Sequence, residues 1–210
     1  MTRRRSRRDF LRAGVGLTAV GLAGCLDAPR RGALLSERFE SGLEGWTTHA
    51  HIGPEEPLSG FDRRIERTRD RAATGEWSLG IFTEGDHDDG TAWATTELDP
   101  GDASSFDVSV RAWSPSESFN TLRNLVVYLG PEEPTTEADF PDPGANSTAV
   151  PDAPFGGLRE PLHLAEGWRE YTFRWESETT PESLFLAVGV SVVWEADATH
   201  YVDDVVVTGE

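Results

Sequence analysis

Two histidines separated by one residue are the side chains best placed to hold a metal ion. His49 and His51 occupy alternate positions of a segment with strand character, so both imidazoles are expected on one face. Imidazole nitrogens that share a face can chelate zinc or another transition metal. The spacing before His49 is short for a metal motif. The sequence therefore favours two surface histidines after a strand.

The histidine pair nevertheless resembles part of the cupin metal motif, because Glu55 and Gly60 follow it. This resemblance implies a metalloenzyme with a similar double sheet. The second histidine motif of the cupins is not recognisable, since His163 lacks the flanking pattern.

Carboxylates are the next candidates for chemistry. Glu195 and Asp197 resemble the paired acids of jelly-roll glycosidases, but no second glutamate follows at the expected place. Retaining glycosidases need two carboxyls roughly 5–5.5 Å apart. The run from Asp86 to Gly90 could bind calcium, although it is more typical of a solvated turn. With no Ser/His/Asp signature, Gly-rich phosphate loop or cysteine nucleophile, the sequence favours a non-catalytic protein.

Acidic residues dominate the chain, which weakens the case for any single carboxylate as a catalyst. The 210 residues include 37 acidic and 19 basic residues, and every basic residue is arginine. Residues 1–24 hold six arginines and one acid, which leaves 13 basic and 36 acidic residues in the rest of the chain. Such a surface repels nucleic acid and anionic lipid headgroups. A lysine-free, acid-rich composition resembles that of extreme halophiles.

The N-terminus resembles a twin-arginine export signal. Its motif residues are Arg7, Arg8, Phe10 and Leu11, and an uncharged apolar stretch follows at 13–24. As a helix this stretch reaches about 18 Å, short of the roughly 30 Å of a bilayer core. Residues 22–25 resemble a lipobox, so we expect cleavage before Cys25, lipid on its thiol and a location on the outer face of the cell membrane. As the single cysteine, Cys25 leaves no internal disulfide.

Apolar and polar residues alternate along short segments, which predicts an all-β domain over 34–210, after the lipidated cysteine and linker at 25–33. At 106–113 the even positions are apolar, and at 168–175 the inward set is Tyr171, Phe173 and Trp175. Further strands are expected near 34–40, 46–51, 65–69, 77–82, 91–98, 122–129, 184–194 and 201–208. About ten strands of this kind form two packed sheets.

A proline-rich, acidic segment at 130–161 interrupts this pattern. It holds seven prolines, so we expect one long loop of a kind that is either functional or loosely ordered. Asn146, Ser147 and Thr148 form a sequon within it, which makes Asn146 a candidate glycosylation site.

Three separated segments together resemble the CenC-type carbohydrate-binding modules, which are galactose-binding-like jelly rolls. They are residues 38–46 (RFESGLEGW), 73–79 (ATGEWSL) and 201–207 (YVDDVVV). The resemblance spans nearly the whole domain and implies a two-sheet antiparallel jelly-roll sandwich. It also implies a non-catalytic module that binds a carbohydrate or cell-surface glycan.

The resemblance to these modules also implies a structural calcium ion between the first and last strands. Asp203 shares the alternation of Tyr201 and the valines that follow, so its carboxylate is expected to face the core, where a cation is a common remedy for a buried charge. By resemblance Glu40 faces this acid, and Gly75 and Glu76 supply backbone carbonyls. The alternatives are Asp204 as the ligand, or an aspartate bonded only to backbone N–H groups.

The same modules hold sugars with aromatic rings and planar polar side chains. The candidates for these roles are Trp93, Trp113, Tyr128, Arg111 and Asn124. Core or rim packing is the alternative for each tryptophan, and Trp175 and Trp194 are expected in the core.

We therefore expect a surface-anchored, monomeric module that binds carbohydrate, carries calcium and has no nucleic-acid partner. A metal-dependent or polysaccharide-cleaving enzyme is one alternative, and it requires His49, His51 and another His or Glu to converge. A structural envelope or adhesion module is the other, and it is distinguished by the absence of an exposed aromatic platform.

Overall fold

The computed structural model describes residues 32–54, 57–86, 89–115, 123–150, 152–162, 167–192 and 197–210. The predicted export signal and Cys25 lie outside these residues. Within the described ranges, no helix is long and apolar enough to cross a membrane.

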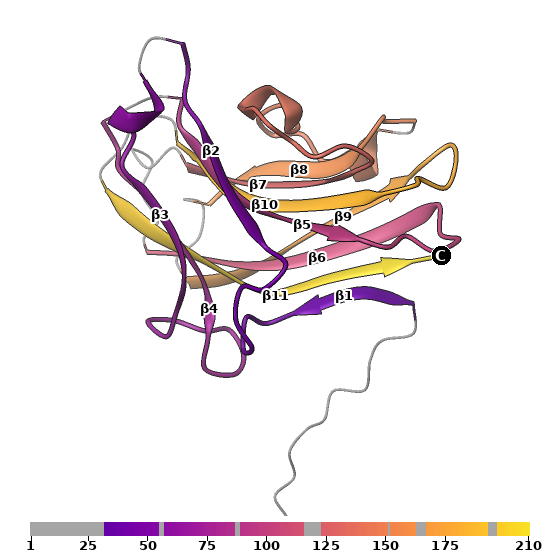
Figure 1. Cartoon of the computed structure of the whole chain (residues 1–210), viewed down its shortest axis with the longest axis horizontal. Helices are drawn as coiled ribbons and strands as arrows, with labels where there is room; N and C mark the ends of the chain where they lie inside the picture. Colours follow the sequence, from indigo (N-terminus) through magenta and orange to yellow (C-terminus); the bar gives the residue numbers. More distant parts are fainter. Residues whose placement is uncertain are drawn as a thin grey trace, which may run out of the picture.

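The described residues form eleven strands in two antiparallel sheets that face each other (Figure 1). The six-stranded sheet contains β1 (Ala33–Glu37), β3 (Arg63–Thr68), β4 (Ser78–Thr83), β6 (Ser105–Ser114), β9 (Gly167–Glu176) and β11 (Ala198–Gly209). The five-stranded sheet contains β2 (Thr47–His51), β5 (Thr91–Leu98), β7 (Arg123–Gly130), β8 (Gly156–Pro161) and β10 (Leu184–Val192). Three 3₁₀ turns complete the elements: η1 (Leu58–Gly60), η2 (Glu137–Asp139) and η3 (Ser147–Ala149). The predicted all-β, jelly-roll sandwich is confirmed.

The last strand lies inside the six-stranded sheet, whose order is β3-β4-β11-β6-β9. One side of β11 pairs with β6; the other pairs first with β4, over 198–202, and then with β1, over 205–208. The five-stranded sheet has the order β2-β5-β10-β7-β8. The first and last strands of the domain are therefore hydrogen-bonded neighbours.

The hydrophobic core fills the space between the two sheets. The even positions of β6 from Phe106 to Ala112 face it, as the alternation predicts. Phe106 stacks on Trp175 of β9 with ring centroids 5.5 Å apart, which confirms Trp175 as a core residue. Large apolar side chains buried in this way each contribute about 1.5–3 kcal/mol to the stability of the fold.

A β-bulge reverses the faces of β11 near its middle. The pairing with β6 shifts by one residue between Asp203 and Val206, and Asp204 adopts φ 48°. Val205 consequently packs in the core, whereas Tyr201 and Asp203 lie on the outer face of the sheet. The prediction that Asp203 faces the core is wrong, because strict alternation does not continue through a bulge.

The proline-rich segment is not a single loop, since its last residues form β8 and pair with β7. The strand begins with two glycines that weaken its sequence signal but are required by packing. A Cβ at Gly156 would lie 2.4 Å from Cβ of Trp175, and one at Gly157 would lie 2.4 Å from the carbonyl oxygen of Val127. The predicted loop at 130–161 is corrected to the segment between Gly130 and Gly156, which we call the covering loop.

Candidate functional site

A line of hydrogen-bonding side chains crosses the outer face of the five-stranded sheet. The strand register aligns His51 with Thr91, Thr91 with Ser191, and Ser191 with Asn124. Directly paired residues of antiparallel strands lie about 4.5–5.5 Å apart on one face, so the four side chains form a continuous line across β2, β5, β10 and β7. We call these four residues the polar row.

The neighbouring register row on this face is centred on Trp93. Trp93 pairs with His49 on one side and with Gly189 on the other, where a Cβ would lie 2.5 Å from Cβ of Trp93. The imidazole of His49 stacks on the indole, with centroids 5.6 Å apart and planes inclined by 16°. Trp93 is fully buried, so its indole is enclosed by its neighbours.

The covering loop supplies the aromatic lid over Trp93. Phe140 meets Trp93 and Tyr128 edge-on, with centroid distances of 5.3 and 6.3 Å. Asp139 holds the preceding turn by accepting the backbone N–H groups of residues 135 and 136, each at 2.8 Å. Burial acts to raise the pKa of Asp139, but these hydrogen bonds outweigh it and the pKa lies below its usual value. Burial raises the pKa of Tyr128 to about 12, so the phenol stays neutral at physiological pH.

Two charged contacts also join the covering loop to this face. Glu137 lies 2.5 Å from Arg159 Nη2 of β8 and accepts a 3.3 Å hydrogen bond from Ser191 Oγ of the polar row. Glu133 Oε1 lies 3.1 Å from His49 Nε2. The loop therefore contacts both register rows through ionisable side chains.

Several buried polar atoms on this face have no hydrogen-bond partner in the part of the chain that the structure describes. They are Thr91 Oγ1, Thr95 Oγ1, Trp93 Nε1, His51 Nδ1 and Arg159 Nε. An unsatisfied buried polar group costs about 1–3 kcal/mol, and most such groups in folded proteins are paired. This face therefore offers unused donors and acceptors that suit a molecule rich in hydroxyl groups.

The structure divides the five predicted ligand residues between the two sheets. Trp93, Asn124 and Tyr128 lie on the outer face of the five-stranded sheet, whereas Arg111 and Trp113 lie on that of β6. Trp93 is 0% and Tyr128 5% exposed, so neither ring forms an open stacking platform. That part of the prediction is wrong, because the covering loop packs over both rings.

Sequence reasoning missed most members of the polar row and Arg159. A signal was present in β10, whose sequence LFLAVGVSV contains one polar residue, Ser191. A lone hydroxyl in an apolar strand points to a buried polar position. The partner of that position, Thr91, could not be found without the strand register.

The metal-enzyme alternative gains no support from the histidine pair. His49 and His51 share the outer face of β2 as predicted, but no group of three or more His, Cys, Asp or Glu within the described ranges could hold a metal ion. Glu55 and Glu195 lie outside the described residues. Asp197 accepts the backbone N–H of Gly85 at 3.2 Å, as a structural carboxylate would.

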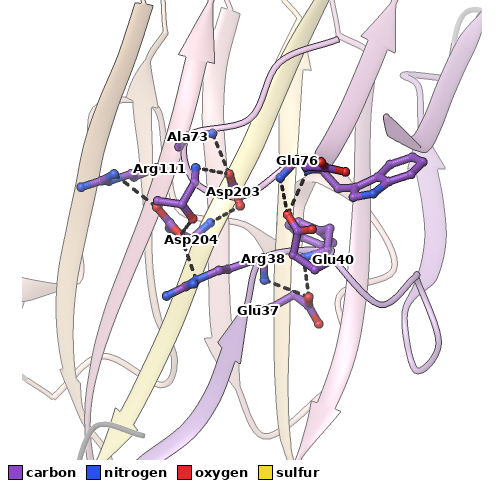
Figure 2. Close-up of polar contacts among 11 residues, drawn as sticks. Glu37, Arg38, Glu40, Ala73, Glu76, Arg111, Asp203 and Asp204 are labelled. Carbon is purple, nitrogen blue, oxygen red and sulfur yellow. Dashed lines mark hydrogen bonds and ion pairs between the residues drawn. The ribbon is translucent and has the colours of Figure 1, made fainter. Parts of the chain in front are cut away.

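A second polar cluster joins the two ends of the domain to the loop between β3 and β4 (Figure 2). Glu40 Oε1 accepts the backbone N–H groups of Glu76 and Trp77 at 2.7 and 3.0 Å. Asp203 Oδ2 accepts those of Ala73 and Thr74 at 2.7 and 3.1 Å. We call this arrangement the terminal clip, since two carboxylates from opposite ends of the chain hold one loop.

The electrostatics of the two clip carboxylates differ. Backbone hydrogen bonding by Glu76 is the main cause that lowers the pKa of Glu40, and burial raises the pKa of Asp203 despite its backbone hydrogen bonds. Asp203 Oδ1 also accepts the N–H of Asp204 at 2.7 Å. Backbone N–H groups thus donate to both carboxylates, two to Glu40 and three to Asp203.

The residues of the terminal clip do not fit the predicted calcium ion. Calcium needs six to eight oxygen ligands directed at one point, whereas Glu40 and Asp203 are directed at backbone N–H groups. The carbonyls of Phe39 and Glu40 accept hydrogen bonds from the guanidinium of Arg67. Asp204, the alternate ligand, pairs with Arg38 at 3.5 Å and Arg111 at 3.2 Å. The clip matches the alternative of an aspartate bonded to backbone N–H groups.

The sequon residue Asn146 is tied into the fold by its side chain. Its Nδ2 donates to Glu160 Oε1 at 3.1 Å and to the carbonyl of Thr172 at 3.0 Å, while Oδ1 accepts the N–H of Thr148. A glycan on Nδ2 leaves a single N–H, so one of the two donated bonds would be lost. Glycosylation of Asn146 stays a prediction that requires this arrangement to change.

Comparisons with known proteins identify the fold. No family model matches the chain, and no curated protein matches it. A carbohydrate-binding module of the β-sandwich superfamily has a TM-score of 0.51 and 21% identity, over 81% of this chain and 60% of its own. The K3 cleaved adhesin domain of Lys-gingipain from Porphyromonas gingivalis has a TM-score of 0.50 and 15% identity, over 85% and 98%. The enzymatically active domain of tailspike protein 4 from bacteriophage CBA120 has a TM-score of 0.50 and 10% identity, over 80% and 20%.

These similarities establish a shared β-sandwich fold. The chain spans 60% of the carbohydrate-binding structure and 20% of the tailspike structure, so each contains further parts. A module, an adhesin domain and an enzyme domain share the architecture, and function must therefore be argued from the side chains of this chain.

Proposed function

We propose that this protein is a non-catalytic module that binds carbohydrate on the outer face of the five-stranded sheet. The observation that carries the proposal is the set of buried, unpartnered atoms on Thr91, Trp93 and Thr95. Sugar hydroxyls donate and accept hydrogen bonds, so they suit a face that combines hydroxyl groups, an indole N–H and a guanidinium N–H. The similarity of the fold to a carbohydrate-binding module supports the same assignment.

The exposure of side chains to solvent varies along the polar row. His51 and Asn124 at its two ends are half-buried, whereas Thr91 and Ser191 between them are fully buried. A ligand meets the two ends first. To reach Thr91, a ligand must displace the side chains that bury it; Ser191 beside Thr91 is held by Arg159 Nη2 at 2.6 Å and by Glu137 Oε1 at 3.3 Å.

The proposed location is the outer surface of the cell membrane, supported by the arginine pair and by Cys25. Replacing Cys25 with serine removes the thiol that would carry the lipid. We expect Cys25→Ser protein in the culture medium. Retention of the variant in the membrane fraction at the wild-type level would contradict lipid anchoring.

Thr91→Val tests the binding site, because valine keeps the shape of threonine and lacks its hydroxyl. The hydroxyl has no partner among the described residues, so its loss should leave stability unchanged or raise it by about 1 kcal/mol. If a sugar hydroxyl bonds Thr91, the same change should weaken affinity about tenfold. The probes are arrayed neutral oligosaccharides of glucose, galactose and xylose, with calorimetry on those that bind.

Thr172→Val is the matched control, since Thr172 is an exposed threonine of β9 in the other sheet. It should keep wild-type affinity for the same oligosaccharide. Equal affinity of Thr91→Val and wild type would contradict the site, and absence of binding to any neutral probe would contradict the function.

A further inference from the structure

An aromatic row crosses the outer face of the six-stranded sheet, opposite the proposed carbohydrate site. The register aligns Tyr201 of β11 with Trp113 of β6, and Trp113 with Trp168 of β9. The rings of Trp113 and Tyr201 meet edge to face, with centroids 5.5 Å apart and planes inclined by 70°. Trp113 and Trp168 are half-buried, so part of this aromatic row faces solvent.

The aromatic row leads into a small polar cavity. The register continues from Tyr201 to Gly80 and from Gly80 to Glu66. Gly80 has no side chain, and a Cβ there would lie 3.0 Å from Cγ2 of Thr68. The resulting cavity of ≈ 80 Å³ is lined by Glu66, Thr68, Asp70 and Tyr201, among others. Its carboxylates and hydroxyl groups can accept hydrogen bonds from the hydroxyls of a ligand.

Arg71 is stacked on this row without an acidic partner. Its guanidinium carbon lies 4.1 Å from the ring centroid of Trp113, and no carboxylate of the described residues lies within ion-pair distance of it. The hydroxyl of Ser78 donates to the Arg71 carbonyl at 2.5 Å, which fixes the backbone that carries the side chain. The donors of a stacked guanidinium remain directed outward in a planar fork.

Arginines near Arg71 in the same sheet make two kinds of contact in this chain of 37 acidic residues: stacking on rings, as Arg169 does on Tyr171, and pairing with carboxylates. Four of them pair with carboxylates at 2.8 to 3.2 Å: Arg64 with Glu66, Arg69 with Glu76, Arg111 with Asp204, and Arg174 with Asp107. The stacking position keeps Arg71 on the indole and leaves its fork for an external acid.

We propose that this surface binds a saccharide that bears a carboxylate, as in a uronic acid. Its ring packs on Trp168, its carboxylate accepts the donors of Arg71, and its hydroxyls extend toward the cavity at Gly80. A planar guanidinium binds a carboxylate through two parallel N–H···O bonds, which a neutral sugar cannot reproduce. The exposed aromatic surface favours a sugar ring over a free small carboxylate.

The net negative charge of the protein opposes such a ligand at long range. At about 1 M salt the Debye length is roughly 3 Å, so this repulsion is screened while contact between Arg71 and a carboxylate persists in part. Binding is therefore best measured at high ionic strength. This site lies on the opposite sheet from the polar row, and its test does not depend on that of the proposed function.

The experiment compares oligomers of galacturonate, mannuronate and glucuronate with their carboxyl-reduced counterparts by calorimetry near 1 M salt. At least one acidic oligomer should bind the wild type about tenfold or more tightly than its reduced form. Arg71→Gln should abolish this preference. Arg174→Gln is the matched control, because it makes the same charge change on the same sheet at an arginine already paired with Asp107.

Trp168→Ala should also weaken binding of the acidic oligomer, because it removes the stacking surface. Equal binding of acidic and reduced oligomers would overturn the proposal. So would an equal loss in Arg71→Gln and Arg174→Gln, no binding of any acidic oligomer, or self-association of the protein as the sole event at this face.

Discussion

The outer faces of the two sheets differ in how far water reaches their side chains. On the five-stranded sheet, the covering loop seals aromatic and polar side chains from water and leaves Thr91 and Trp93 with unused polar atoms. On the six-stranded sheet, water reaches the strands and charged side chains pair with each other, as Arg174 does with Asp107. An unpaired group therefore means something different on each face. On the covered face it is a buried hydroxyl or indole, and on the open face it is a guanidinium stacked on a ring without a carboxylate partner among the described residues, as at Arg71.

Trp93 and Trp113 were both predicted to bind sugar, and replacing them should give the largest difference in stability between the two faces. Trp93→Ala should lower the free energy of unfolding by about 3–5 kcal/mol, because it leaves a cavity beneath the covering loop. Trp113→Ala should cost about 1 kcal/mol, since that ring is half-exposed. Denaturant unfolding measures both values. Equal losses would mean that the covering loop does not seal its sheet.

The contrast also shows what alternation along a strand can and cannot predict. The core faces of β6 and β9 followed from a period of two, because each strand is regular over its length. Alternation also placed Trp113 on the outer face of β6. The pattern could not show which outer face is covered. The cover depends on Phe140, which lies 47 positions after Trp93 in the chain and packs against it.

Irregular backbone explains the remaining errors. The bulge at Asp204 reversed the face of Asp203, and the glycines at the start of β8 concealed a strand. Both features are set by tertiary contacts. Asp203 accepts a backbone N–H of the loop between β3 and β4, and Trp175 packs closely against Gly156. Local pattern does not contain that information.

The two faces should also differ in what their ion pairs contribute. Glu137→Gln leaves the largely buried guanidinium of Arg159 without its counter-charge and should destabilise the fold by about 3 kcal/mol. Asp107→Asn breaks the exposed pair with Arg174 and should have a much smaller effect, because solvent screens that pair. Thermal unfolding at two salt concentrations distinguishes the two losses of stability, because salt screens an exposed ion pair more than a buried one. A loss in Glu137→Gln that salt abolishes would place this pair in solvent.

Within the terminal clip, the two carboxylates should respond to pH in opposite directions. The lowered pKa of Glu40 means that its contribution to stability is present above pH 4.5 and is lost as the pH falls through its native pKa. The raised pKa of Asp203 means the reverse: its contribution is present below pH 3.8 and is lost as the pH rises through its native pKa.

Replacing each carboxylate by its isosteric amide tests these opposite pH dependences of stability. The stability advantage of wild type over Glu40→Gln should shrink as the pH falls below 4.5. Wild type should gain stability relative to Asp203→Asn as the pH falls toward 3.8. Chemical unfolding over this pH range gives both differences, and slopes of the same sign would contradict the assigned environments.

The smallest effect is expected from removing divalent cations. A calcium ion bound only to the folded state at about a hundred times its Kd would stabilise the domain by roughly 2.7 kcal/mol, so a chelator would lower its Tm by several degrees. Because Glu40 and Asp203 are directed at backbone N–H donors and Arg67 holds the nearby carbonyls, we expect the Tm to stay within about one degree. A Tm that rises with calcium in wild type and not in Asp203→Asn would instead establish a metal at the clip. The open face would then carry a bound cation at the clip in addition to the guanidinium of Arg71, which has no carboxylate partner among the described residues.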